Sequence, residues 1–145
     1  MSDNTVNILL VEDDELDAEA IDRAFKKVRI GNPIHVVRDG LAALEKLRGQ
    51  GGADPMPHPY LILLDLNLPR MNGIEFLAAL RDDEALRDSI VFVLSSSDDD
   101  RDKLAAYEKH VAGYVVKSKA GEDFMNLIGM LDHYWRIVEF PPPSD

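Results

Sequence analysis

The chain alternates short apolar runs with longer amphipathic stretches. Five runs are apolar at nearly every successive position, and they lie at Val6–Val11, Ile34–Val37, Tyr60–Leu64, Ile90–Leu94 and Tyr114–Val116. Strands with this pattern are typically buried on both faces, as in a parallel sheet covered by helices. The intervening stretches show helical spacing, and residues 14–28, for example, place Leu16, Ile21 and Phe25 on one stripe. The pattern therefore predicts five strand–helix units.

Right-handed crossovers between such units give a flavodoxin-like (βα)5 doubly wound sandwich, an α/β fold with five parallel strands in the order 2-1-3-4-5. We expect one domain over residues 1–138, which includes an extended last helix, followed by a tail at 139–145 and no output domain. The segment Gly49–Pro59 contains three Gly and three Pro, so we expect a solvated loop there.

Composition narrows the possible functions. The 145 residues include 16 Lys plus Arg and 27 Asp plus Glu, which gives a net charge of −11. This excess of acid argues against nucleic acid and against an anionic membrane surface as partners. The chain has no Cys, so disulfides and thiolate metal sites are excluded. It shows no secretory signal, and no apolar run approaches the roughly 20 residues of a membrane span. We expect a cytoplasmic protein.

Polar residues follow four of the predicted strands. Glu12 and Asp13 follow the first, Asp65 the third, Ser95 the fourth and Lys117 the fifth. The carboxyl ends of parallel strands meet at one edge of the sheet, where such folds bind their ligands. Three carboxylates there repel one another unless a cation lies among them, and oxygen ligands without His or Cys favour Mg²⁺. A carboxylate beside Mg²⁺ is a possible phosphoryl acceptor.

Four segments carry a resemblance to a known family. They are Ile8–Asp14, Leu63–Gly73, Val93–Ser95 and Gly113–Lys117. In order and in spacing, including the 30 positions from Asp65 to Ser95, they resemble the receiver domain of two-component response regulators. The resemblance runs from about Val6 to Leu131.

The resemblance implies that Asp65 accepts a phosphoryl group from a histidine kinase, as a 4-aspartylphosphate. It also implies Mg²⁺, for which Mn²⁺ or Ca²⁺ can substitute, held by the side chains of Asp13 and Asp65. The backbone carbonyl of Asn67 is a further expected ligand, and Glu12 is expected to bind through a water. Lys117 is expected to pair with Asp65 or with its phosphate.

Other expected roles concern signalling. By the same resemblance, Ser95 and Tyr114 form the switch pair, and Asn67 and Ser97 occupy positions that tune autodephosphorylation. The family usually has Pro after the lysine, where this chain has Ser118. Such a domain is not an enzyme acting on outside substrates, since it catalyses only its own phosphotransfer and slow dephosphorylation.

A narrower resemblance is to the stand-alone regulators that partner cyanobacterial phytochromes and bacteriophytochromes. It rests on the Glu-Asp pair, the Gly/Pro-rich segment, the Lys-Ser pair and an aromatic end at 132–136. It implies a phytochrome-type histidine kinase, an onward partner of unknown identity, and a homodimer through the last helix and tail. The predicted dimer surface is an exposed apolar strip of Tyr134, Trp135, Ile137 and Phe140. Alternatively, Trp135 and Val138 fold back on the domain's own core.

Two other classes of protein share this type of fold. A Mg²⁺-dependent phosphohydrolase with an Asp nucleophile needs a second acid two residues on, where this chain has Asn67. A nucleotide- or flavin-binding module needs a Gly-rich first turn, where this chain has acids at 12–14. The acids at 98–100 resemble a metal motif only superficially, and we expect Ser97 to cap the helix that follows them.

Overall fold

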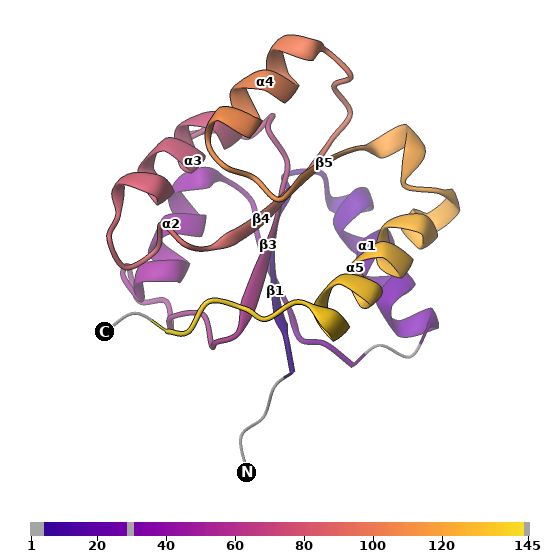
Figure 1. Ribbon diagram of the computed structural model, residues 1–145, viewed down its shortest axis with the longest axis horizontal. Coiled ribbons are helices and arrows are strands. Elements are labelled where there is room, and N and C mark those ends of the chain that lie inside the picture. Colours follow the sequence, from indigo (N-terminus) through magenta and orange to yellow (C-terminus); the bar gives the residue numbers. More distant parts are fainter. Residues whose placement is uncertain (1–4, 29–30, 144–145) are drawn as a thin grey trace.

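The computed structural model describes residues 5–28 and 31–143, which form one parallel sheet between two layers of helices (Figure 1). The strands are β1 (Asn7–Val11), β2 (Ile34–Val37), β3 (Tyr60–Leu64), β4 (Ile90–Ser95) and β5 (Gly113–Val116). The helices are α1 (Glu15–Lys27), α2 (Gly40–Arg48), α3 (Gly73–Asp82), α4 (Asp100–Glu108) and α5 (Met125–Ile137), with two short 3₁₀ helices before α5, η1 (Lys117–Lys119) and η2 (Glu122–Phe124). The strand order is β2-β1-β3-β4-β5, which confirms the predicted fold.

Burial on both faces explains the unbroken apolar runs. Every residue of β1 and β3 is buried, and successive side chains alternate between two cores. Leu9 and Ile62 join the core beneath α2, α3 and α4, whereas Ile8 and Leu61 join the core beneath α1 and α5. Figure 1 shows the same division, with α1 and α5 side by side on one face of the sheet.

Short polar side chains begin four of the helices. Asp14, Asp39 and Asn72 accept backbone N–H groups in the first turns of α1, α2 and α3. At α4 this role belongs to Asp99, which accepts the N–H of Arg101, so the predicted cap at Ser97 is wrong. The hydroxyl of Ser97 instead accepts the N–H of Asp99 and donates to Asp102, because α4 begins two residues later than predicted.

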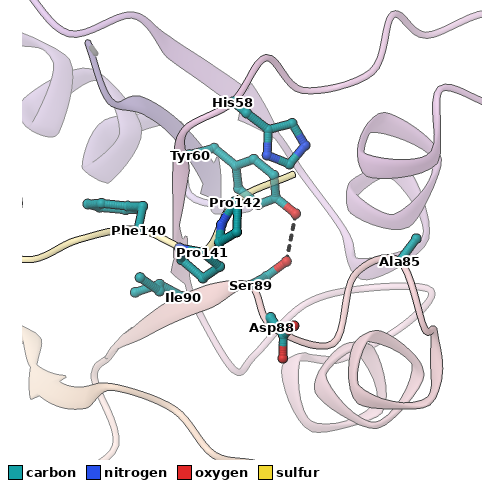
Figure 2. A pocket seen from close by; sticks show the side chains of 9 residues that line it. All are labelled: His58, Tyr60, Ala85, Asp88, Ser89, Ile90, Phe140, Pro141 and Pro142. Carbon is teal, nitrogen blue, oxygen red and sulfur yellow. Dashed lines mark hydrogen bonds between the residues drawn. The ribbon is translucent and has the colours of Figure 1, made fainter. Parts of the chain in front are cut away.

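After α5 the chain crosses beneath the amino ends of the strands (Figure 1). Phe140, Pro141 and Pro142 lie against Ile90 and beside Tyr60, whose hydroxyl is hydrogen bonded to Ser89 at 2.6 Å (Figure 2). The tail thus covers the edge of the sheet opposite the strand ends where polar residues gather.

The aromatic residues of this region pack within the chain. The ring centroids of Trp135 and Phe25 are 6.1 Å apart. The ring of Tyr134 lies edge-on to Phe92 and to Phe140, with centroid distances of 4.9 Å and 6.2 Å. Tyr134, Trp135 and Phe140 are partly buried against the core beneath α1 and α5, as the alternative of a folded-back Trp135 predicts, and the dimer surface stays a prediction. Ile137, at 83% exposure, is the member of the predicted strip that faces solvent. In the part of the chain that the structure describes, no helix combines the length and apolarity needed to cross a membrane.

Candidate functional site

Four strands deliver polar side chains to one edge of the sheet. Glu12 directly follows β1, Asp65 directly follows β3, Ser95 ends β4 and Lys117 directly follows β5. Glu12, Asp65 and Ser95 are each less than one-tenth exposed. These side chains lie together because the strands are parallel and in register, with Val11 opposite Leu64 and Ser95 opposite Val116.

Lys117 lies at the centre of this group. Its Nζ is 2.8 Å from Glu12 Oε1, 2.7 Å from Asp17 Oδ2 and 3.5 Å from Asp65 Oδ2. The ammonium therefore provides positive charge that the neighbouring carboxylates require. The lysine side chain is 16% exposed, so these contacts are only partly screened by solvent.

Asp17 is a member of the site that the sequence does not single out. It lies in the first turn of α1, and α1 begins directly above the end of β1, so its carboxylate reaches the same edge as Glu12. The surrounding acids at 12–15 hide it, because nothing in the pattern distinguishes an acid that faces the site from one that faces solvent.

The charged groups shift one another's protonation. Burial raises the pKa of Glu12 to about 7, with the hydrogen bond from Lys117 acting against burial and the neighbouring Asp65 acting with it. Burial also opposes the charged form of Lys117, but the hydrogen bonds to Asp17 and Glu12 outweigh it and hold the pKa of Lys117 above its usual range. Lys117 is therefore a permanently charged group at this site.

Backbone donors fix the two buried carboxylates. The N–H of Asn67 donates to Asp65 Oδ1 at 3.2 Å, and the N–H of Asp14 donates to Glu12 Oε2 at 3.2 Å. The backbone N–H of Asp65 donates to the carbonyl of Val11 at 3.0 Å, which ties the end of β3 to β1. Asp65 is thus held with its carboxylate directed at the edge of the sheet.

The loop after Asp65 is anchored on α2. Arg70 donates two hydrogen bonds of 3.0 Å to the carboxylate of Asp39, and the N–H of Gly40 donates to the carbonyl of Met71 at 3.0 Å. A Cβ at Gly40 would lie 2.4 Å from that carbonyl oxygen, so this close approach requires glycine. The anchored loop carries Asn67, whose carbonyl is a predicted metal ligand.

The predicted metal ligands are oxygen atoms, but they are not gathered as three carboxylates. Asp13 is exposed, and the described residues contain no cluster of three His, Cys, Asp or Glu side chains that could hold a metal. Mg²⁺ keeps several of its waters and needs only one or two carboxylates, so Asp65, an acid at 12 or 13 and the Asn67 carbonyl fit this ion. The set contains no sulfur or imidazole ligand that would favour a softer metal.

The predicted switch pair is connected through Ser97. The N–H of Ser97 donates to Ser95 Oγ at 3.1 Å, and the hydroxyl of Tyr114 donates to the Ser97 carbonyl at 2.9 Å. Ser95 is fully buried, and Tyr114 is partly buried against the core beneath α2, α3 and α4. The Ser95 and Tyr114 side chains are thus linked through the backbone of Ser97.

A buried Asp, an ammonium and a hydroxyl at the carboxyl edge of a five-stranded parallel sheet are the arrangement that the receiver resemblance predicts. The chain belongs to the response regulator receiver domain family, whose pattern matches residues 8–129. This confirms the family resemblance seen in the four sequence segments. Members of this family are generally not true enzymes, and the family implies a bound divalent metal.

Individual relatives place the chain near phytochrome signalling proteins. Response regulator Rcp1 of Synechocystis is 38% identical over 128 residues, which cover 88% of this chain and 87% of Rcp1. The crystal structure of its Mn²⁺-bound form matches with a TM-score of 0.83 at 37% identity, covering 94% of this chain and 99% of that one. The phosphorylated cyanobacterial phytochrome response regulator RcpA matches with a TM-score of 0.84 at 33% identity, with coverage of 94% and 99%. The bacteriophytochrome response regulator RtBRR matches with a TM-score of 0.73 at 39% identity, with coverage of 95% and 84%. The chain is thus related to phytochrome response regulators.

Proposed function

We propose that this chain is a response regulator receiver that accepts a phosphoryl group from a histidine kinase on Asp65. The observation that carries the proposal is the position of Asp65, which lies at the end of the central strand β3 with Lys117 Nζ 3.5 Å from its Oδ2. A carboxylate oxygen of Asp65 attacks phosphorus, and the bond from phosphorus to the kinase imidazole nitrogen breaks. The electron pair stays on that nitrogen, which then takes up a proton.

The surrounding residues stabilise the transferred group. The ammonium of Lys117 lies close enough to contact a phosphoryl oxygen on Asp65, and the Ser95 hydroxyl ends the neighbouring strand. A divalent metal would be held by the side chains of Asp13 and Asp65, by the Asn67 carbonyl and, through a water, by Glu12. It would neutralise charge on the phosphoryl oxygens.

The signal then passes from Ser95 to Tyr114. The hydrogen bonds through Ser97 support this coupling, in which the Ser95 hydroxyl moves toward the phosphate and the tyrosine ring turns inward behind it. The side chains of Asn67 and Ser97 tune the lifetime of the phosphoryl group. Residues 1–138 act as the receiver and 139–145 as its tail, and the output is a partner protein in a phosphorelay.

The proposed kinase is of the phytochrome type. Similarity to Rcp1, RcpA and RtBRR over most of the chain supports this assignment. Phosphotransfer profiling against a set of labelled histidine kinases tests it: phytochrome kinases should transfer fastest, and preference for an unrelated kinase would contradict it.

Phosphoryl acceptance itself is tested with a small donor. We expect ³²P-labelled acetyl phosphate to label the chain once per molecule, with a bond that hydroxylamine cleaves because it is an acyl phosphate. Borohydride reduction followed by peptide mass spectrometry should locate the label at Asp65. A label that resists hydroxylamine, or one located at another residue, would contradict the proposal.

Removal of the metal should slow this reaction. With EDTA present, we expect the labelling rate to fall by at least about tenfold, because the charge on the phosphoryl oxygens is no longer neutralised by a divalent cation. Excess Mg²⁺ should restore the rate, and Mn²⁺ should substitute for it. Equal rates with and without EDTA would show that Lys117 alone supplies the positive charge.

The predicted homodimer can be tested at Ile137, the last residue of α5, whose side chain is exposed. If two chains associate through this helix and the tail, Ile137→Asp should convert a dimer into a monomer in sedimentation equilibrium, because the substitution places a charge in an apolar contact. Leu16→Asp on α1 is the matched control, since Leu16 is 75% exposed and lies outside the proposed contact. A wild-type mass of one chain would contradict the prediction.

A further inference from the structure

Asp17 holds Lys117 more closely than Asp65 does. The distance from Lys117 Nζ is 2.7 Å to Asp17 Oδ2 and 3.5 Å to Asp65 Oδ2. The two acids come from different elements, since Asp17 lies on α1 and Asp65 follows β3. The ammonium is therefore shared between a helix and the sheet, and its strongest contacts are not with the proposed acceptor.

An ammonium donates three hydrogen bonds, and strong acceptors already occupy two of them. Glu12 and Asp17 accept at 2.8 and 2.7 Å, whereas 3.5 Å to Asp65 is the outer limit of a hydrogen bond. Asp17 is 29% exposed, so its position can adjust, whereas Glu12 is buried and fixed by the N–H of Asp14. Asp17 is thus the partner that can release Lys117.

We propose that Asp17 is a positioning residue that restrains Lys117 away from Asp65 and so lowers the rate at which Asp65 accepts a phosphoryl group. The inference rests on the proposed function and deepens it. In the unphosphorylated protein Asp17 competes with Asp65 for the ammonium. When a phosphoryl group arrives, its oxygens offer a stronger acceptor, and Lys117 must weaken its bond to Asp17 to reach them.

A purely structural role for Asp17 makes a different prediction. As an acid in the first turn of α1, Asp17 also interacts favourably with the helix dipole. In a purely structural role, its removal would lower the free energy of unfolding without acting through Lys117. Asp22 provides a matched control on the same helix, because it forms an ion pair with Lys26 at 2.9 Å. Asn at either position keeps the size of the side chain and removes its charge.

The experiment measures the second-order rate constant for labelling by acetyl phosphate in a double-mutant cycle. Asp17→Asn should raise the rate constant roughly fivefold. Since a tenfold change corresponds to about 1.4 kcal/mol, this lowers the activation free energy by about 1 kcal/mol. Asp22→Asn should leave it unchanged, and Asp17→Glu should remain within twofold of wild type. In a Lys117→Met background, Asp17→Asn should change the rate by less than twofold, because the restrained group is absent.

Two labelling results would overturn the inference. One is a labelling rate for Asp17→Asn within twofold of wild type, and the other is an equal change in the Lys and Met backgrounds. The ¹⁵N resonance of the Lys117 ammonium is a second measurement, and it should shift in Asp17→Asn and stay in place in Asp22→Asn; an unmoved resonance also overturns the inference. Failure of the proposed function is distinguishable, since wild type itself would then carry no label at Asp65.

Discussion

Asp65→Asn should abolish phosphoryl labelling by acetyl phosphate and by kinases. The amide oxygen of Asn is a poor nucleophile, because it carries no negative charge, so no acyl phosphate can form at this position. The substitution keeps the size of the side chain and one oxygen to accept the N–H of Asn67, which now donates at 3.2 Å. We therefore expect a folded protein with no label above background in an autoradiogram.

Asp132→Asn is the matched control for this loss. Asp132 lies on α5 and pairs with Arg136 at 3.0 Å, away from the carboxyl ends of the strands. This variant should be labelled like wild type. Label retained by Asp65→Asn would place the acceptor elsewhere, with the neighbouring acids of the edge as the next positions to replace.

The sequence predicts the fold and most of this site for one shared reason. Strands that are apolar at every position must be parallel and covered, and that topology alone brings residues at 12, 65, 95 and 117 to one edge. Asp17 escapes prediction because its role depends on how α1 leaves β1 and on which side of the helix faces Lys117. Both are tertiary features with no periodic signal in the sequence.

The tail shows a second limit. Its aromatic residues indicate burial, but the pattern does not reveal whether a partner chain or the same chain provides the covering surface. The answer for Trp135 depends on its contact with Phe25 of α1, which lies more than 100 positions away in the sequence. The cap of α4 is a smaller instance, since Ser97 and Asp99 are both good caps and the geometry of the loop decides between them.

Arg81→Met should lower the free energy of unfolding, measured by urea denaturation, by about 3 kcal/mol. The reason is that hydrogen bonds from a charged donor contribute about 1.5–3 kcal/mol. Arg81 lies near the end of α3, and burial lowers the pKa of its guanidinium. That guanidinium donates at 2.5–2.9 Å to the backbone carbonyls of Arg87, Ser89, Lys109 and His110. One side chain thus joins α3 to the segment before β4 and to the turn after α4.

Two variants separate this bridging role from loss of charge alone. Arg101→Met removes a cation whose side chain is 91% exposed and paired with Asp99. It should change the free energy of unfolding little, because surface ion pairs contribute little. Arg81→Lys keeps the charge, but a single ammonium cannot reach carbonyls that the planar guanidinium contacts in several directions, so less than half of the lost stability should return. Equal losses for Arg81→Met and Arg101→Met would contradict the bridging role. Because the bridged turn lies directly before β5, which carries Tyr114, a loosened turn should also broaden the amide resonances of that strand in NMR spectra.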